Sequence, residues 1–331
     1  MAGLLYGITP VNDVLAAIQR WRYGAALREA PPLSAPLFIL GHWRSGTTLL
    51  HELLSFDPRF SCPNTYQCFA PHHFLVSEWF FQRFGRWMLP ARRPMDDMEL
   101  GWARPQEDEF ALMNLGLPSP YRMLAFPPHD RPSPDLQYLD GDQIQGAARE
   151  AWIMGLRQFL TAVSLHEPRR LVLKSPTHTG RLDLLSSAFA GAQFIHLTRD
   201  PRELLPSTKR LWEKLCLAQA LDRRPWEHVE GYVLECGSRM YEAFHRQRDR
   251  ATAAAPLMDV SFEQLVSSPV ETVEQIYAQL QLGNFESVRP RLQQWAESAH
   301  REYRRNQHTL STDDEVKLKQ AWSAYFLRYG Y

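Results

Sequence analysis

The feature that most constrains this chain is a strand, a glycine loop and a helix that follow one another within residues 36–54. Four apolar residues at 37–40 predict a short buried strand. Gly41 and Gly46 permit a tight loop, and the run from Thr47 has the apolar spacing of a helix. Such a loop directs backbone N–H groups toward one point at the helix N-terminus, where an anion is favoured. The sequence therefore predicts a phosphate or sulfate site.

The spacing within this loop narrows the kind of anion site. Gly41, Gly46 and Thr48 stand where the phosphate-binding pattern G-x-x-x-x-G-K-[ST] has its glycines and hydroxyl, but Thr47 occupies the lysine position. Arg44 lies inside the loop and offers a planar fork of donors that suits an oxyanion. A glycine-bearing turn without function is the alternative, and the clustering of these features favours the anion site.

Composition limits the class of protein and of partner. The chain has 331 residues, 44% of them hydrophobic, which is enough for the core of one large domain or of two closely packed ones. Its 37 basic and 37 acidic residues cancel, which argues against a broad electrostatic partner such as duplex nucleic acid or an anionic membrane, so any anion binding is expected to be local. We expect a cytoplasmic enzyme without stable membrane insertion, since the N-terminus lacks a signal-peptide pattern and no apolar run is long enough to span a bilayer. The four cysteines lack metal-binding spacing and are expected to be free thiols, and no metal site is expected.

Strand and helix patterns alternate along the chain. Strands are expected at 37–40, 171–173, 193–198 and 257–262, with helices between them. This alternation predicts an α/β fold with a central parallel sheet and helices on both faces. Residues 61–134 interrupt it with an insertion rich in proline and aromatic residues, whose aromatics either fill the core or form a lid over an apolar acceptor pocket.

Capping residues indicate where several helices begin. Ser175, Asp200 and Ser268 are each followed by proline, and Asp200 and Ser268 each have a glutamate three residues later. The first helix is expected over 11–27 with Asn12 as its N-cap, and Gly283 is expected to close the helix that Ser268 opens.

Basic residues follow the ends of two further strands. Lys174 comes after the strand at 171–173, and Arg199 after the strand at 193–198, with Ser207 eight residues later in the following helix. Ligands of open parallel sheets bind beyond the carboxyl ends of the strands. The glycine loop, Lys174 and Arg199 are therefore expected to lie on one rim of the sheet.

These residues together resemble a sulfotransferase that uses 3′-phosphoadenosine-5′-phosphosulfate (PAPS), of the bacterial type related to tyrosylprotein and carbohydrate sulfotransferases. The loop at 41–48 resembles the family's 5′-phosphosulfate loop, and Arg199 with Ser207 resembles its 3′-phosphate pair. The segments at 174–178 and 260–266 also resemble the family, and the similarity covers roughly residues 37–282. It implies a P-loop NTPase-like three-layer fold and transfer of a sulfuryl group to a hydroxyl by in-line displacement.

The resemblance also implies roles for single residues. Arg44, Ser45, Gly46, Thr47 and Thr48 would bind the 5′ end of PAPS. The 3′-phosphate would be bound by Arg199 and Ser207, with Arg304 and Arg305 as further candidates in place of the glycine motif of the cytosolic branch, or else as part of a solvated helix end. Family members need no metal for the transfer.

Sulfuryl transfer needs charge stabilisation and a general base. Arg44 and Lys174 are the candidates for stabilising charge. Glu107 is the first candidate for the base, followed by Glu109 and His178. The glutamate of the tyrosylprotein branch has no counterpart here, because residues 63–66 contain no carboxylate. A solvated helix start remains the alternative for the carboxylates at 107–109.

The whole chain, 1–331, is thus expected to be one sulfotransferase domain. Its parts would be the 5′-phosphosulfate loop and helix (37–56), the insertion (61–134), the second half of the sheet with the 3′-phosphate site (171–282) and the C-terminal helices (284–331). The expected acceptor is a small, hydrophobic molecule with a hydroxyl, and a homodimer is left open. The alternatives are a P-loop kinase that uses ATP and a non-catalytic nucleotide-binding module.

Overall fold

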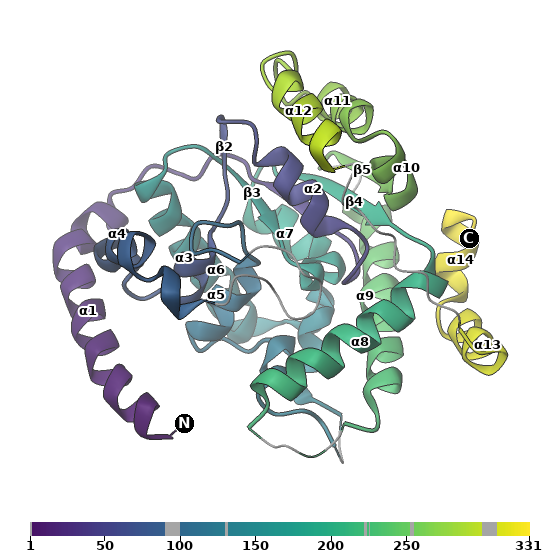
Figure 1. Cartoon of the computed structure of the whole chain (residues 1–331), viewed down its shortest axis with the longest axis horizontal. Helices are drawn as coiled ribbons and strands as arrows, with labels where there is room; N and C mark the ends of the chain where they lie inside the picture. Colours follow the sequence, from purple (N-terminus) through teal and green to yellow (C-terminus); the bar gives the residue numbers. More distant parts are fainter. Residues whose placement is uncertain are drawn as a thin grey trace.

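A parallel β-sheet forms the centre of the molecule (Figure 1). The computed structural model describes residues 2–89, 100–129, 132–221, 224, 226–251, 255–299 and 310–331. Within these ranges the sheet has five strands in the order β2-β3-β1-β4-β5, and every neighbouring pair is parallel. The strands are β1 (Leu37–Leu40), β2 (Phe60–Ser61), β3 (Arg170–Lys174), β4 (Gln193–Thr198) and β5 (Leu257–Ser261).

Helices cover both faces of this sheet. The α-helices are α1 (Ala2–Arg28), α2 (Thr47–Leu54), α3 (Thr65–Phe69), α4 (Phe74–Phe84), α5 (Asp108–Asn114), α6 (Gly146–His166), α7 (Leu182–Ala188), α8 (Pro201–Gln219), α9 (Val229–Ala251), α10 (Phe262–Ser267), α11 (Pro269–Leu280), α12 (Arg289–Ala299), α13 (Thr312–Ala321) and α14 (Ser323–Tyr329). The 3₁₀ helices are η1 (Arg86–Met88), η2 (Pro120–Leu124), η3 (Pro134–Leu139), η4 (Gly141–Gln143) and η5 (Pro176–Arg181). No helix in the described ranges is both long and apolar enough to cross a membrane.

The alternation of side chains along β1 explains the three layers. All four residues of β1 are buried, and successive residues of a strand point to opposite faces of the sheet. Phe38 and Leu40 belong to the core beneath α6, α7, α8 and α9, whereas Leu37 and Ile39 belong to the core beneath α2, α10 and α11. The α/β fold with a central parallel sheet and helices on both faces is therefore confirmed.

The insertion at 61–134 contributes to the core and to the surface. Tyr66, Phe74 and Tyr121 are buried in the core on the α6 side. Other aromatic residues of the insertion, such as Trp79 and Trp87, are exposed. The core alternative is thus correct for part of the insertion, and the lid over an acceptor pocket stays a prediction.

Several local expectations were wrong. The first helix begins at Ala2, ahead of the expected cap at Asn12, and the short edge strand β2 carries no recognisable sequence signal. Asp200 does cap α8, where its side chain accepts a hydrogen bond from the Arg202 N–H, but the Ser175 and Ser268 side chains make no capping bond. Helix α11 ends at Leu280 with Gln281 as its left-handed C-cap, so Gly283 does not close it.

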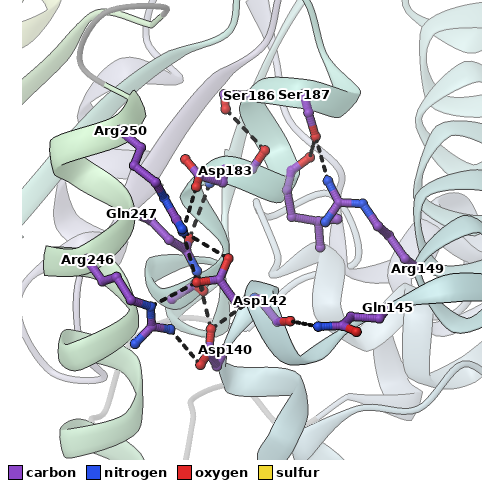
Figure 2. Close-up of polar contacts among 12 residues, drawn as sticks. Asp140, Asp142, Gln145, Arg149, Asp183, Ser186, Ser187, Arg246, Gln247 and Arg250 are labelled. Carbon is purple, nitrogen blue, oxygen red and sulfur yellow. Dashed lines mark hydrogen bonds and ion pairs between the residues drawn. The ribbon is translucent and has the colours of Figure 1, made fainter.

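An ion-pair cluster joins α9 to η4 and α7 (Figure 2). Its pairs are Arg246–Asp140, Arg246–Asp142, Arg250–Asp142 and Arg250–Asp183. Beside them, the buried Gln247 donates a hydrogen bond to the Gly180 carbonyl (3.0 Å) and accepts one from the Asp183 N–H (3.2 Å). These contacts hold η5, which directly follows β3, against α9.

Candidate active site

The glycine loop after β1 has the backbone of a tight turn. Gly41, Arg44 and Gly46 have positive φ angles of 142°, 69° and 96°. A Cβ on Gly41 would lie 2.6 Å from the Ser45 Oγ and 2.8 Å from the Leu197 carbonyl oxygen, so the loop leaves no room for a side chain there. Gly46 is the N-cap of α2 and offers no side chain to the N–H groups of the first turn, which leaves them available to an anion.

The first half of this loop is held by the framework of the protein. The Gly41 N–H donates to the Thr179 hydroxyl (2.8 Å), and the His42 N–H donates to the Tyr241 hydroxyl (3.2 Å). Burial lowers the pKa of His42 to about 4 despite its hydrogen bond with the Trp43 carbonyl. The N–H groups of Gly41 and His42 are thus already bonded, which leaves residues 44–48, at the start of α2, as the candidate anion-binding part of the loop.

The end of β3 meets the first turn of α2. The Lys174 Nζ donates to the Thr48 hydroxyl (3.3 Å) and to a Glu107 carboxylate oxygen (2.6 Å). The other Glu107 oxygen accepts a hydrogen bond from the Tyr121 hydroxyl, which also accepts one from the indole N–H of Trp43 (2.9 Å). The Glu107 side chain is 15% exposed, so this carboxylate is accessible beside the loop.

A second basic cluster lies where the loop meets β4 and α8. The Arg44 Nε donates to the Ser207 hydroxyl (3.0 Å), and the Arg199 guanidinium donates to the Arg44 carbonyl (2.7 Å). Arg199 also pairs with Glu203 (2.6 Å) and stacks over the Phe262 ring, 4.0 Å from its centroid. The expected 3′-phosphate pair is therefore in direct contact with the expected 5′ loop.

Two buried ion pairs stand behind Glu107. Asp108 pairs with His178 and Glu109 with Arg181, each at 2.6 Å, and all four side chains are fully buried. Burial by itself would raise the pKa of Asp108, but the charge of His178 and its hydrogen bond lower it overall. Burial likewise opposes the effect of Arg181, which lowers the pKa of Glu109 overall. Both carboxylates are thus held as anions inside the protein.

The structure brings most of the expected site residues to one rim. Those at the carboxyl edge of the sheet are Arg44, Ser45, Gly46, Thr47, Thr48, Glu107, Lys174, Arg199 and Ser207. Among them, Ser45 is fully buried and donates to the His42 carbonyl within the loop. Glu109 and His178 lie in the interior, and Arg304 and Arg305 lie outside the described residues. The described residues contain no group of three or more His, Cys, Asp or Glu side chains that could hold a metal ion.

Four neighbours of the site were missed by sequence reasoning. Tyr121 contacts Glu107, while Glu203 and Phe262 contact the Arg199 guanidinium. Tyr325, near the C-terminus, accepts a hydrogen bond from the Arg199 N–H (3.0 Å). The sequence did indicate the contact between Glu203 and Arg199, because residues four apart on a helix can pair, but the pattern was interpreted only as part of a helix start.

Comparison with known proteins identifies the family to which a chain with this site belongs. A model of the sulfotransferase family matches residues 36–287. The chain belongs to the sulfotransferase family. It is 35% identical, over 324 residues, to the omega-hydroxy-beta-dihydromenaquinone-9 sulfotransferases Stf3 of Mycobacterium tuberculosis and Mycobacterium bovis, and the match covers 98% of this chain and 82% of each relative. The chain is therefore an enzyme of sulfuryl transfer, and the family resemblance seen in the sequence is confirmed.

Solved sulfotransferases share the fold of this one. Sulfotransferase STF9 of Mycobacterium avium aligns with a TM-score of 0.73 at 19% identity, over 95% of this chain and 81% of that protein. Sulfotransferase STF1 of Mycobacterium tuberculosis aligns with a TM-score of 0.63 at 18% identity, over 94% and 81%. The P-loop-like three-layer fold is thus confirmed, and the family assignment decides against the kinase and the non-catalytic module.

Proposed function

We propose that this sulfotransferase transfers the sulfuryl group of PAPS to the terminal hydroxyl of a small, hydrophobic acceptor. The observation that carries the proposal is the contact between two anion-binding clusters, through the hydrogen bond from Arg44 to Ser207. PAPS has anionic groups at both ends of its ribose, so it requires two such clusters. A nucleotide with phosphates on the 5′ side alone requires only one.

The donor set fits PAPS at both ends. The first turn of α2, with Lys174 and Thr48 beside it, offers N–H, ammonium and hydroxyl donors to the 5′-phosphosulfate. Arg199 and Ser207 offer a guanidinium and a hydroxyl to the 3′-phosphate. Arg44 belongs to the loop that would bind the 5′-phosphosulfate, and its side chain extends to Ser207, which would bind the 3′-phosphate.

We assign the general base to Glu107. Its carboxylate is the one of residues 107–109 that is partly exposed, and it shares Lys174 with the anion-binding loop. Glu107 would accept the proton of the acceptor hydroxyl while the new oxygen–sulfur bond forms and the sulfur–oxygen bond to the 5′-phosphate breaks. Lys174 and Arg44 would stabilise the charge left on the departing phosphate. The burial and pairing of Glu109 and His178 support a structural role for both.

A row of aromatic rings supports a hydrophobic acceptor. Phe69, which is 51% exposed, stacks on Phe110 (5.6 Å between ring centroids), and Phe110 packs on Tyr121 (4.9 Å), which bonds Glu107. The row thus leads from the surface to the proposed base. The Stf3 relatives are named for a hydroxylated dihydromenaquinone, and we propose an acceptor of the same chemical class, with a hydroxyl on a long apolar chain.

Calorimetric titration with adenosine 3′,5′-bisphosphate, the product of the donor, tests the donor assignment. We expect binding without added metal, and we expect Arg199→Ala to lose about 1.5–3 kcal/mol of binding free energy, typical of a hydrogen bond to a charged group. Tighter binding of ATP with Mg²⁺, or unchanged bisphosphate affinity in Arg199→Ala, would overturn the proposal. The cytoplasmic location, the single-domain organisation and the oligomeric state stay predictions.

A further inference from the structure

Helix α1 presents an apolar stripe to solvent instead of to the core. Its members recur at helical spacing, so they share one face of the helix. They are Val11, Val14, Ile18 and Trp21, whose exposed fractions are 56%, 60%, 41% and 84%. Ala16 and Gln19, on the opposite face, are buried. A helix of a globular protein normally turns its apolar stripe inward, so this outward stripe points to an interaction.

The neighbouring segment from α4 through η1 is also apolar and exposed. Its exposed residues are Trp79, Phe80, Phe84, Trp87 and Met88. Helices α1 and α4 lie side by side at the left edge of the molecule in Figure 1, where the Leu75 N–H donates to the Gln19 side chain (2.8 Å). We call these two sets of residues, with the arginines among them, the aromatic–basic face.

The charge of this face is positive, although the chain as a whole is neutral. Five arginines, all exposed, occur within residues 14–28 and 74–89; they are Arg20, Arg22, Arg28, Arg83 and Arg86. The single carboxylate in these two segments is Glu78, which is buried and accepts hydrogen bonds from Asn64 and Gln82. Two exposed carboxylates, Asp13 and Glu29, adjoin the first segment, so the five arginines still outnumber the exposed carboxylates of this part of the surface.

We propose that the aromatic–basic face docks on the surface of an anionic lipid bilayer. Tryptophan suits the boundary between headgroups and acyl chains because its ring is apolar and its N–H is polar, and arginine is attracted to anionic headgroups. A symmetric contact with a second copy would bring the same arginines against one another, which is unfavourable. Charge complementarity thus favours the lipid surface over self-association.

The position of the face also relates it to the active site. Helix α3 packs against both α4 and α5, and it carries Phe69, the exposed end of the aromatic row that leads to Tyr121 and Glu107. A chain docked through α1 and α4 would have this end of the row near the bilayer, from which an acceptor with an apolar tail would enter. This second step rests on the proposed function, whereas docking itself does not.

Vesicle sedimentation with the purified full-length chain tests the docking. We expect the chain to sediment with vesicles of equal parts phosphatidylglycerol and phosphatidylcholine, and to stay in solution with phosphatidylcholine alone. Arg83→Gln and Arg86→Gln should each weaken binding about fivefold. Trp21→Ala and Trp87→Ala should each weaken it about tenfold, because each removes a large apolar side chain from the contact.

Two substitutions on other surfaces are the matched controls. Arg239→Gln on α9 removes the same charge, and Leu327→Ala on α14 removes a side chain that is 86% exposed; neither should change binding. Failure to sediment, equal sedimentation with both vesicles, or equal loss in the controls would overturn the proposal. So would a dimer in solution that Trp21→Ala dissociates, in a chain that does not bind vesicles. Bisphosphate affinity, measured on the same samples without vesicles, tests the donor site separately.

Discussion

Three consecutive carboxylates have different surroundings, and we expect their substitutions to have different effects. Glu107 bonds Lys174 and Tyr121 at the edge of the loop and is partly exposed. We predict that Glu107→Gln lowers turnover about 10²–10⁴-fold, because a positioned base contributes that much. Bisphosphate affinity should stay within a few-fold, since the amide keeps the shape of the side chain. Steady-state kinetics and calorimetry on the same variant measure the two effects, and unchanged turnover would exclude Glu107 as the base.

The neighbouring Glu109 provides the contrasting variant. It is fully buried, pairs with Arg181 and accepts hydrogen bonds from Ser119 and Thr177. Glu109→Gln leaves the Arg181 charge buried without its counter-ion, which typically costs about 3–5 kcal/mol of stability. We predict a fall of that size in the free energy of unfolding, measured with urea. A stably folded Glu109→Gln enzyme without turnover would instead give this residue the role of base.

Glu203 is a carboxylate on the guanidinium that we assign to the 3′-phosphate. It lies 2.6 Å from Arg199, so a phosphate on Arg199 would meet its negative charge. We predict that Glu203→Gln tightens bisphosphate binding about fivefold, which corresponds to roughly 1 kcal/mol for a partly exposed pair. Calorimetry at low and high salt checks this, because an electrostatic gain should shrink as salt rises. Weaker binding in Glu203→Gln would show that the carboxylate orients Arg199 for the phosphate.

At the scale of elements, the turn into α2 needs glycine at position 46 for two reasons, a positive φ angle and the absence of a Cβ. Substitutions at two glycines can separate them. Gly46 has φ 96°, and a Cβ there would lie 2.4 Å from the Phe262 ring, which stacks on Arg199. Gly116 also has a positive φ, 84°, but nothing lies within 4 Å of its Cβ position. Gly116→Ala therefore measures backbone strain alone, about 1–2 kcal/mol.

We predict that Gly46→Ala impairs both stability and donor binding more than the control Gly116→Ala does. It should destabilise the protein by more than Gly116→Ala, because Phe262 must move as well, and it should weaken bisphosphate binding, because Arg199 loses the ring beneath it. Urea unfolding and calorimetry on both variants make the comparison. Equal loss of stability and unchanged affinity would mean that Phe262 adjusts without disturbing Arg199.

Elements with a regular pattern were predictable from the sequence, and irregular ones were not. The four strands expected from apolar runs are present, because buried parallel strands need continuous apolar residues. Strand β2 has only two residues, too few to show a period. Ser175 looked like a helix cap, but its hydroxyl donates to Asp108 instead (2.9 Å). A cap pattern in the sequence predicts only hydrogen bonds between neighbouring residues. Here the Ser175 hydroxyl bonds instead to the buried carboxylate of Asp108, which belongs to the insertion.

At the scale of the whole molecule, topology predicted which residues meet but not how they pair. Parallel strands place their carboxyl ends on one edge, so the loop after β1, Lys174 and Arg199 had to converge. The partners that come from outside the sheet, Tyr121 and Tyr325, could not be placed in this way. They belong to the irregular insertion and to the C-terminal helices, whose positions depend on packing across the entire fold.

The buried histidines around this site make stability depend on pH. Burial lowers the pKa of His42 to about 4, and burial together with the charge of Lys174 lowers that of His51 to about 3. An unfolded histidine binds a proton near its ordinary pKa of about 6.5, whereas these two stay neutral in the folded state. Their contribution is therefore fully present above that value, and it is lost as the pH falls toward the folded pKa.

We predict that the free energy of unfolding falls steadily between about pH 6 and pH 4.5, by up to about 1.4 kcal/mol per pH unit for each of the two histidines. His51→Gln keeps an N–H donor for the Val172 carbonyl, which the His51 Nε2 contacts at 3.2 Å, but cannot be protonated. It should therefore make the free energy of unfolding depend less steeply on pH, by the contribution of one histidine. Urea unfolding of the unsubstituted protein and of His51→Gln across the pH range measures the two slopes. An unchanged slope in His51→Gln would mean that His51 is protonated equally in the folded and unfolded states, so that burial and the neighbouring Lys174 do not keep it neutral.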